Sequence, residues 1–196
     1  MTARPHLLAT SLLIALVVTL PCAAQEATPE VRAAARQQFE SGVSAAHEAR
    51  WEQAREAFRL SYELFPHHST LLNLAGSEAE TGRLVEAAET YRRFLREAPA
   101  DDARRALASA TLSELEARIP QLRVLGAPAS ASELRVDGRA MPVRVLDAAL
   151  PLDPGTHALR VESPEGARCG SVELAEGDRR EVTLAPPFRL DRIGLQ

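Results

Sequence analysis

The chain contains no lysine, so all 23 of its basic residues are arginine. Acidic residues outnumber them at 27, and the formal net charge at pH 7 is −4. Such a balance offers no excess of basic surface for the phosphates of a nucleic acid. We therefore expect no nucleic-acid partner.

Cysteine and aromatic residues are also scarce. Cys22 and Cys169 are the two cysteines, and aromatic residues make up 4% of the chain. Because Cys22 lies in a segment that we expect to be removed, no internal disulfide is predicted. Cys169 is expected to be a small buried hydrophobe, with an intermolecular bridge or a reactive thiol as alternatives.

The first 24 residues have the pattern of a secretory signal. Arg4 precedes an uncharged apolar run from Leu7 to Leu20, and small residues follow it. We expect cleavage after Ala24, no membrane span thereafter, and a periplasmic or secreted protein. A retained anchor and a lipid on Cys22 are the alternatives, but the run is shorter than the ~20 apolar residues that a spanning helix needs.

Two stretches of the chain repeat each other at an interval of 33 positions. The equivalent residues are Gly42 and Ala75, Ala54 and Ala87, Phe58 and Tyr91, and Pro66 and Pro99. A fixed period in this range is typical of stacked helix–turn–helix units. Arrays of such units bind partners through extended surfaces.

Each unit is predicted to hold two helices, because apolar residues recur at three- and four-residue spacing. The predicted ranges are 31–49, 51–64, 70–81 and 84–97. Gly42 is expected to let two helices approach closely, and Gly82 to end a helix in the left-handed conformation. A fifth helix, from Asp101-Asp102 to Pro120, is expected to cover the apolar flank that two units leave open.

The equivalent residues resemble the pattern of the tetratricopeptide repeat, which has two small positions, an aromatic position and a late proline. The chain departs from the pattern at Gln38 and Ala45, where the family often has tryptophan and tyrosine. The resemblance covers about 65 residues. It implies an array in which the first helix of each unit lines a concave face.

That resemblance supplies a set of candidate residues for binding a peptide. They are Arg36, Phe39, Val43, His47, Leu72, Asn73, Gly76 and Glu80. Arg36 is suited to a carboxylate, and Asn73 to an extended peptide backbone. Alternatively, Phe39 and Leu72 are core residues and Asn73 braces a neighbouring helix. The family's clamp for two carboxylates, built on several lysines and asparagines, is absent, so chaperone-type C-terminal tails are not expected as ligands.

From Gln121 onward the apolar residues alternate, which predicts strands. Seven short strands are expected, at 122–124, 134–136, 143–146, 150–152, 157–161, 172–174 and 182–184. Asp137-Gly138 is a strong hairpin signal. His157 is expected on one face with Leu159 and Val161, as a satisfied, partly buried histidine rather than a catalytic base. The pattern as a whole predicts a small β-sandwich.

This half is similar to the PEGA domain, a small extracytoplasmic β-sandwich. The matching segments are 126–128, 136–138, 151–152, 154–157 and 182–184. The string Pro-Glu-Gly-Ala occurs at 164–167, in a later turn, while Pro128-Ala129-Ser130-Ala131 stands where the family has that motif. The resemblance implies a protein of the bacterial cell envelope.

The sequence lacks the residue patterns that are typical of catalytic, metal and phosphate-binding sites. His67-His68 has no cysteine or carboxylate spaced to complete a metal site. Neither a glycine-rich phosphate loop after a strand nor a Gly-x-Ser-x-Gly motif occurs. We expect no catalysis, no metal and no cofactor.

The sequence therefore predicts an α+β chain in two domains. A signal peptide (1–24) precedes a tetratricopeptide-like array of two repeats and a capping helix (25–119), a PEGA-like β-sandwich (120–187) and a tail (188–196). The predicted function is that of a non-catalytic exported scaffold whose array binds a protein or peptide. The alternative is binding of an envelope or cell-wall polysaccharide by the β-sandwich, although Phe188 is the only aromatic residue after Gln121.

Overall fold

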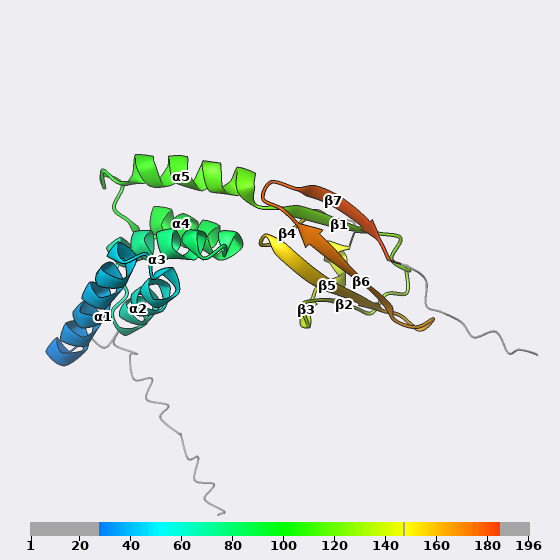
Figure 1. Ribbon diagram of the computed structural model, residues 1–196, viewed down its shortest axis with the longest axis horizontal. Coiled ribbons are helices and arrows are strands. Elements are labelled where there is room, and N and C mark those ends of the chain that lie inside the picture. Colours follow the sequence, from blue (N-terminus) through cyan, green and yellow to red (C-terminus); the bar gives the residue numbers. More distant parts are fainter. Residues whose placement is uncertain (1–27, 147, 185–196) are drawn as a thin grey trace, which may run out of the picture.

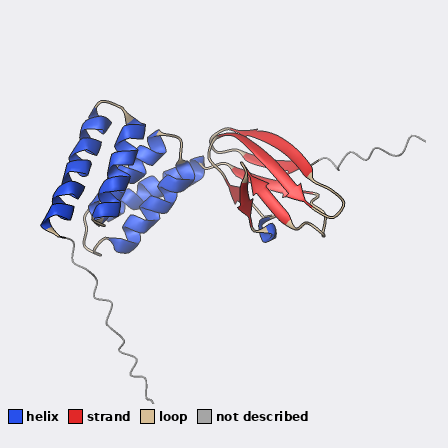
Figure 2. Ribbon diagram, turned by 90° about the horizontal axis from the view of Figure 1, so that it is seen from below, coloured by secondary structure: helices blue, strands red, loops and turns tan. Residues whose placement is uncertain are grey.

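The computed structural model describes residues 28–146 and 148–184. The expected signal peptide and tail lie outside the described residues. Within these ranges, five helices come first and strands in two sheets follow, an α+β composition (Figure 1). The helices gather at one end of the molecule and the strands at the other (Figure 2). None of the described helices has the length and apolar character that crossing a membrane requires.

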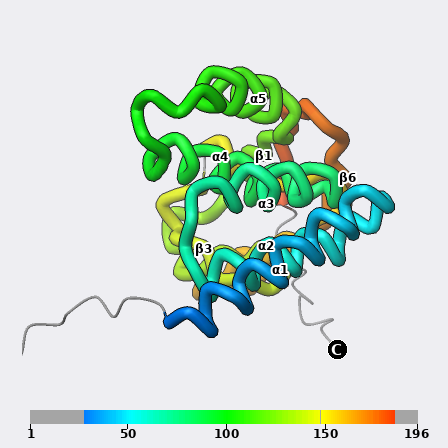
Figure 3. The backbone as a smooth tube through the Cα atoms, turned by 90° about the vertical axis from the view of Figure 1, so that its left-hand side faces the viewer, coloured from blue at the N-terminus to red at the C-terminus, as the bar shows by residue number. Residues whose placement is uncertain are grey.

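The helices pack on one another in chain order. They are α1 (Pro29–His47), α2 (Trp51–Leu64), α3 (His68–Glu80), α4 (Leu84–Glu97) and α5 (Arg105–Arg118). The contacts join α1 to α2, α2 to α3, α3 to α4 and α4 to α5. As a result, α3 and α4 lie between the first pair of helices and α5 (Figure 3).

The predicted bounds of α2 and α4 are confirmed to the residue, while α1 and α3 both begin two residues earlier than predicted. The reason is capping of their first turns. The Thr28 hydroxyl accepts the Val31 amide at 3.4 Å, and Nδ1 of His67 accepts the Ser69 amide at 3.3 Å. The sequence pattern had placed neither cap.

Close contact between α1 and α2 depends on Gly42. A Cβ atom at this position would lie 2.7 Å from the ring of Phe58, which is only 1% exposed. Phe58 belongs to a buried cluster with Ala45, Ala54 and Leu74, residues of α1, α2 and α3. The packing role expected for Gly42 is confirmed.

The two units end their first helix with the same turn. Ala49 and Gly82, which are 33 positions apart, both have a positive φ, of 55° and 76°. In each turn the next amide donates to the carbonyl five residues back, at 2.9 Å. This is the Schellman arrangement, and its left-handed position favours glycine over alanine.

The fifth helix covers α4 as expected, but it begins at Arg105 rather than at Asp101-Asp102. The Asp102 carboxylate accepts the Arg104 amide at 2.9 Å and pairs with the Arg104 guanidinium, which holds Asp102 in the preceding turn. Further along, Leu115 and Ile119 pack on Leu84 and the alanines beside it.

The strands form two sheets. One has the order β4-β1-β7 and consists of β1 (Gln121–Leu125), β4 (Leu150–Pro151) and β7 (Arg179–Thr183), with β1 and β7 parallel. The other has the order β3-β2-β5-β6 and consists of β2 (Glu133–Val136), β3 (Arg139–Met141), β5 (Gly155–Glu162) and β6 (Arg168–Leu174). Aliphatic residues of both sheets join in one buried cluster, which includes Leu122, Leu134, Leu159 and Val161.

One predicted strand is wrong. Residues 143–146 contain a short 3₁₀-helix, η1 (Val143–Val145), and the strand beside β2 is β3 instead. Asp137 and Gly138 both have positive φ and form a two-residue hairpin turn, so the residues directly after them pair with β2. Pro142 then lacks the N–H that would continue the ladder.

The expectation that Cys169 is buried is also wrong, because its side chain is exposed. Side chains of β6 alternate between the two faces. Cys169 therefore shares the exposed face with Ser171 and Glu173, while Leu174 points into the core.

Replacing Gly42 with alanine is expected to lower the free energy of unfolding by about 1–3 kcal/mol, because the new Cβ overlaps the Phe58 ring. Gly76→Ala is the matched control. A Cβ there meets no atom within 4 Å, so the better helix former should stabilise by up to ~1 kcal/mol. Urea unfolding measures both, and equal effects would contradict the close contact.

The left-handed turns predict opposite effects of opposite substitutions. Ala49→Gly should raise the free energy of unfolding by about 0.5–1 kcal/mol, and Gly82→Ala should lower it by about 1 kcal/mol. The reason is that only glycine adopts the observed positive φ without strain. Thermal unfolding compares the two, and a destabilised Ala49→Gly variant would count against the assigned turn.

Candidate functional site

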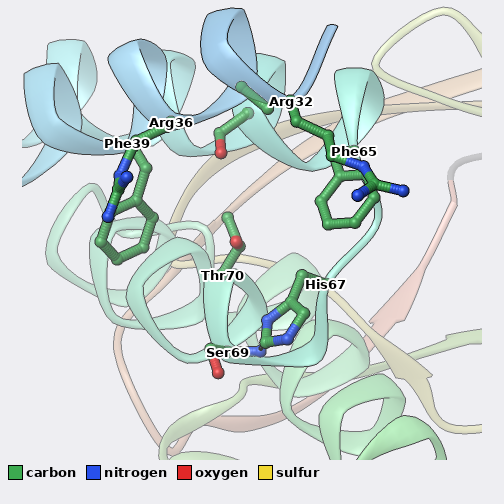
Figure 4. A pocket seen from close by; sticks show the side chains of 9 residues that line it. Arg32, Arg36, Phe39, Phe65, His67, Ser69 and Thr70 are labelled. Atoms are coloured by element: carbon green, nitrogen blue, oxygen red, sulfur yellow. Dashed lines mark hydrogen bonds between the residues drawn. The ribbon is translucent and has the colours of Figure 1, made fainter. Parts of the chain in front are cut away.

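A pocket of about 490 Å³ opens between α1, the end of α2 and the start of α3 (Figure 4). Its lining residues are Arg32, Ala35, Arg36, Phe39, Ser61, Phe65, His67, Ser69 and Thr70. The volume lies in the range that is usual for ligand pockets. The pocket is the candidate binding site.

Helical spacing brings the α1 residues to one face. Arg32, Arg36 and Phe39 are four and three residues apart, so their side chains project to the same side of α1. Phe39 packs edge-on against Phe58, with 5.4 Å between the ring centroids. The wall of the pocket therefore rests on the buried contact between α1 and α2.

The opposite wall exists because α2 ends at Leu64 and the chain turns at once into α3. Pro66 cannot continue the hydrogen bonds of α2. The turn places the ring of Phe65 and the first residues of α3 against α1 (Figure 4).

The rim of the pocket carries positive charge. The Arg32 guanidinium lies 5.6 Å from the centroid of the Phe65 ring, a cation–π distance. Arg36 pairs with Glu40 at 3.6 Å, but both side chains are highly exposed. Exposed ion pairs contribute little free energy, so Glu40 does not hold Arg36 firmly. None of the described residues that line the pocket is acidic. An anionic ligand is therefore favoured over a cationic one.

Two buried hydroxyls line the same pocket. Ser61 and Thr70 are 3% and 5% exposed, and both line the pocket. Figure 4 shows Thr70 in the midst of the lining side chains. Since a hydroxyl both donates and accepts hydrogen bonds, these two side chains are the neutral polar groups that helices α2 and α3 bring to the pocket.

The beginning of α3 adds a further polar feature. The amides of the first turn of a helix have no partner within the helix and favour negative charge. Here His67 caps the helix and lines the pocket. Burial lowers the pKa of His67, as do the nearby charges of His68 and Arg104, and this favours the neutral form of its ring.

The predicted groove residues divide between this pocket and other places. Arg36 and Phe39 line the pocket, whereas Val43 and Leu72 pack against buried clusters. Glu80 lines a second, separate hollow beside Trp51.

The remaining three candidates, His47, Asn73 and Gly76, are not among the lining residues of either pocket. The Asn73 amide donates to the Ser69 carbonyl of its own helix at 3.5 Å.

Several lining residues were missed by the sequence reasoning. Arg32 could have been found, because it lies one helical turn before Arg36 on the same face. Phe65, His67, Ser69 and Thr70 gave no comparable signal, since they reach the pocket only through the turn between α2 and α3.

A second perturbed group lies near the end of α3. Glu78 is 7% exposed, and its Oε2 has no hydrogen-bond partner in the described part of the structure. Burial raises the pKa of Glu78 to about 7, although the Thr90 hydroxyl and the charges of Arg55 and Arg83 partly offset this. Glu78 is therefore half protonated near neutral pH.

Metal-ligating groups do not converge in the described ranges: no three histidine, cysteine, aspartate or glutamate residues there are placed to hold an ion. His67 and His68 stack with their ring centroids 4.5 Å apart. Nε2 of His68 lies 3.4 Å from Oδ2 of Asp102.

Comparisons with family models, with curated proteins and with solved structures gave no match to this chain.

The buried Glu78 predicts a pH-dependent stability. Its folded-state pKa lies above its ordinary value of 4.5, so its contribution is present at low pH and is lost as the pH rises through about 7. The wild-type free energy of unfolding should therefore fall by on the order of 2 kcal/mol more than that of Glu78→Gln between about pH 5 and pH 8. Denaturant titrations at several pH values measure this difference.

Glu80→Gln is the matched control, because Glu80 is exposed on the same helix. It should leave the wild-type pH dependence unchanged. If Glu78→Gln also leaves it unchanged, the buried carboxylate does not carry the effect.

Proposed function

We propose that this protein is an exported, non-catalytic adaptor of the bacterial cell envelope that binds an acidic segment of a partner protein in the pocket between α1 and α3. In this proposal the helices form a tetratricopeptide-like domain and the strands a second, PEGA-like domain. The observation that carries the proposal is the lining of the pocket, which combines apolar walls with two rim arginines and no acidic residue.

The chemistry of the lining defines the ligand. An apolar side chain fits between the rings of Phe39 and Phe65, where it is removed from water. Carboxylates beside it reach the guanidinium groups of Arg32 and Arg36, which can each hold a carboxylate with two hydrogen bonds. The buried hydroxyls of Ser61 and Thr70 can then bond the peptide backbone.

The repeated turn supports the proposed array, and so does the buried cluster that α1 and α2 share with α3. The turns at Ala49 and Gly82 have the same hydrogen bonds at the same interval as the sequence repeat. The exported location rests on the sequence pattern of residues 1–24 and on the PEGA resemblance.

Binding of fluorescent peptides that combine glutamates with one leucine or phenylalanine tests the proposal. The double variant Arg32→Ala, Arg36→Ala should weaken binding by at least about ten-fold, because two charge-assisted hydrogen-bonding groups are lost. Arg59→Ala is the control, since Arg59 pairs with Glu56 and Glu63 on α2 and does not line the pocket. Fluorescence anisotropy gives the dissociation constants.

Two outcomes would contradict the proposal. One is equal binding of a peptide in which glutamine replaces every glutamate. The other is full affinity in the double variant. In the cell, a photo-crosslinker in place of Ser69, a lining residue to which the proposal assigns no peptide contact, should capture a partner at such an acidic segment. Capture of envelope polysaccharide alone would favour the alternative function.

A further inference from the structure

A contact between the helices and the strands lies away from the chain connection that joins α5 to β1. The Oδ1 atom of Asp153, in the turn between β4 and β5, accepts the amide of Val85 at 2.8 Å. Val85 is the second residue of α4, and no side chain of α4's own N-terminal flank caps this turn. Asp153 therefore caps α4 from the strand side of the molecule.

His157 holds the same turn from behind. Its side chain is 8% exposed, with Nδ1 2.7 Å from Oδ2 of Asp137 and Nε2 2.7 Å from the backbone carbonyl of Asp153. Both partners are acceptors. A neutral imidazole can donate from only one nitrogen, so this geometry needs the doubly protonated, charged ring.

The other acceptor is a carboxylate rather than a neutral acid. Oδ1 of Asp137 accepts the Ala158 amide at 2.8 Å while Oδ2 faces His157. Burial raises the pKa of Asp137, but these hydrogen bonds outweigh burial and hold it below its ordinary value. Asp137 therefore accepts at both oxygens and fixes the proton on Nδ1.

We propose that the charge on His157 controls how firmly the strand half is held on α4. When His157 loses a proton, Nδ1 keeps the remaining one because it faces the carboxylate. The lone pair of Nε2 then faces the Asp153 carbonyl, and the two repel each other. The carbonyl turns away, and the Asp153 carboxylate moves off the first turn of α4.

Other charges near His157 favour its protonated form on balance. It shares a pocket of about 450 Å³ with Arg83, the residue before α4, with Glu86 of α4, with Asp137 and Arg139 of the β2–β3 hairpin, and with Asp153. Three carboxylates thus face two guanidinium groups. The pocket also gives water a route to the joint between the strand half and α4, where Asp153 contacts Val85, once the contact between His157 and Asp153 opens.

The pH direction follows from the same contacts. Burial lowers the pKa of His157, but the hydrogen bonds to Asp137 and Asp153 outweigh it, and the net shift is upward from 6.5. The joint is therefore closed below the ordinary histidine pKa and opens as the pH rises through the higher folded-state value.

Two NMR readouts on the full chain test this inference, in a Glu78→Gln background, because burial raises the pKa of Glu78 to about 7. The first is the nitrogen shifts of the His157 ring. The second is the hydrogen-exchange protection of the Val85 amide, compared with that of the Ala87 amide. The Ala87 amide is the reference because it donates to the carbonyl of Arg83, directly before α4, and not to Asp153. Between about pH 5.5 and pH 9, His157 should pass from two protonated nitrogens to one, and Val85 should lose several-fold in protection relative to Ala87.

Three variants make the result decisive. His157→Gln should give low Val85 protection at both pH values, and Asp153→Ala should do the same without altering the buried core of the strands. His47→Gln is the control, because His47 is exposed on α1. If His157→Gln does not fold, the wild-type titration and Asp153→Ala still decide.

The inference is overturned if the His157 ring carries a single proton at the lower pH. It is equally overturned if Val85 protection stays constant while His157 loses its proton. Peptide binding in the α1–α3 pocket is a separate measurement, so failure here does not bear on the proposed function.

Discussion

The ring of Phe58 against the backbone of Gly42 is the contact on which the helical half depends. It sets the distance between α1 and α2, because any side chain at position 42 would overlap the ring. It also supports Phe39, which forms one wall of the pocket. The shape of the candidate binding site therefore follows from a close approach that glycine alone permits.

The joint between the helices and the strands rests on different physics. Most buried residues of each half are apolar and pack within that half. Across the joint, polar contacts recur: Asp153 with Val85, the Arg118 guanidinium with both oxygens of Glu176, and Arg179 with the Ile119 carbonyl. Charged and hydrogen-bonded contacts respond to pH and salt, whereas apolar packing does so much less.

Residue spacing alone predicted much of the fold. The bounds of α2 and α4 follow from apolar periodicity and from Pro66, Gly82 and Pro99, which act locally. The hairpin at Asp137-Gly138 and the inward face of β5 are local signals of the same kind. The prediction of a strand at 143–146 was wrong. The hairpin turn makes the residues directly after it, which form β3, pair with β2.

The site was less predictable, for a physical reason. Arg36 and Phe39 could be placed on one face of a helix, but a pocket also needs its opposite wall. That wall comes from Phe65 and the first turn of α3, whose positions depend on how α2 ends and how α3 packs against α1. Likewise, nothing local marks Asp153 as the cap of α4, since the two lie 68 residues apart.

We propose that the pocket between α1 and α3 holds an acidic segment of a partner by an apolar side chain. Intermolecular NOEs between a bound glutamate-rich peptide and the protein would locate that side chain. We expect NOEs from the apolar side chain of the peptide to the rings of both Phe39 and Phe65. NOEs confined to the strand half, with none to these rings, would contradict it.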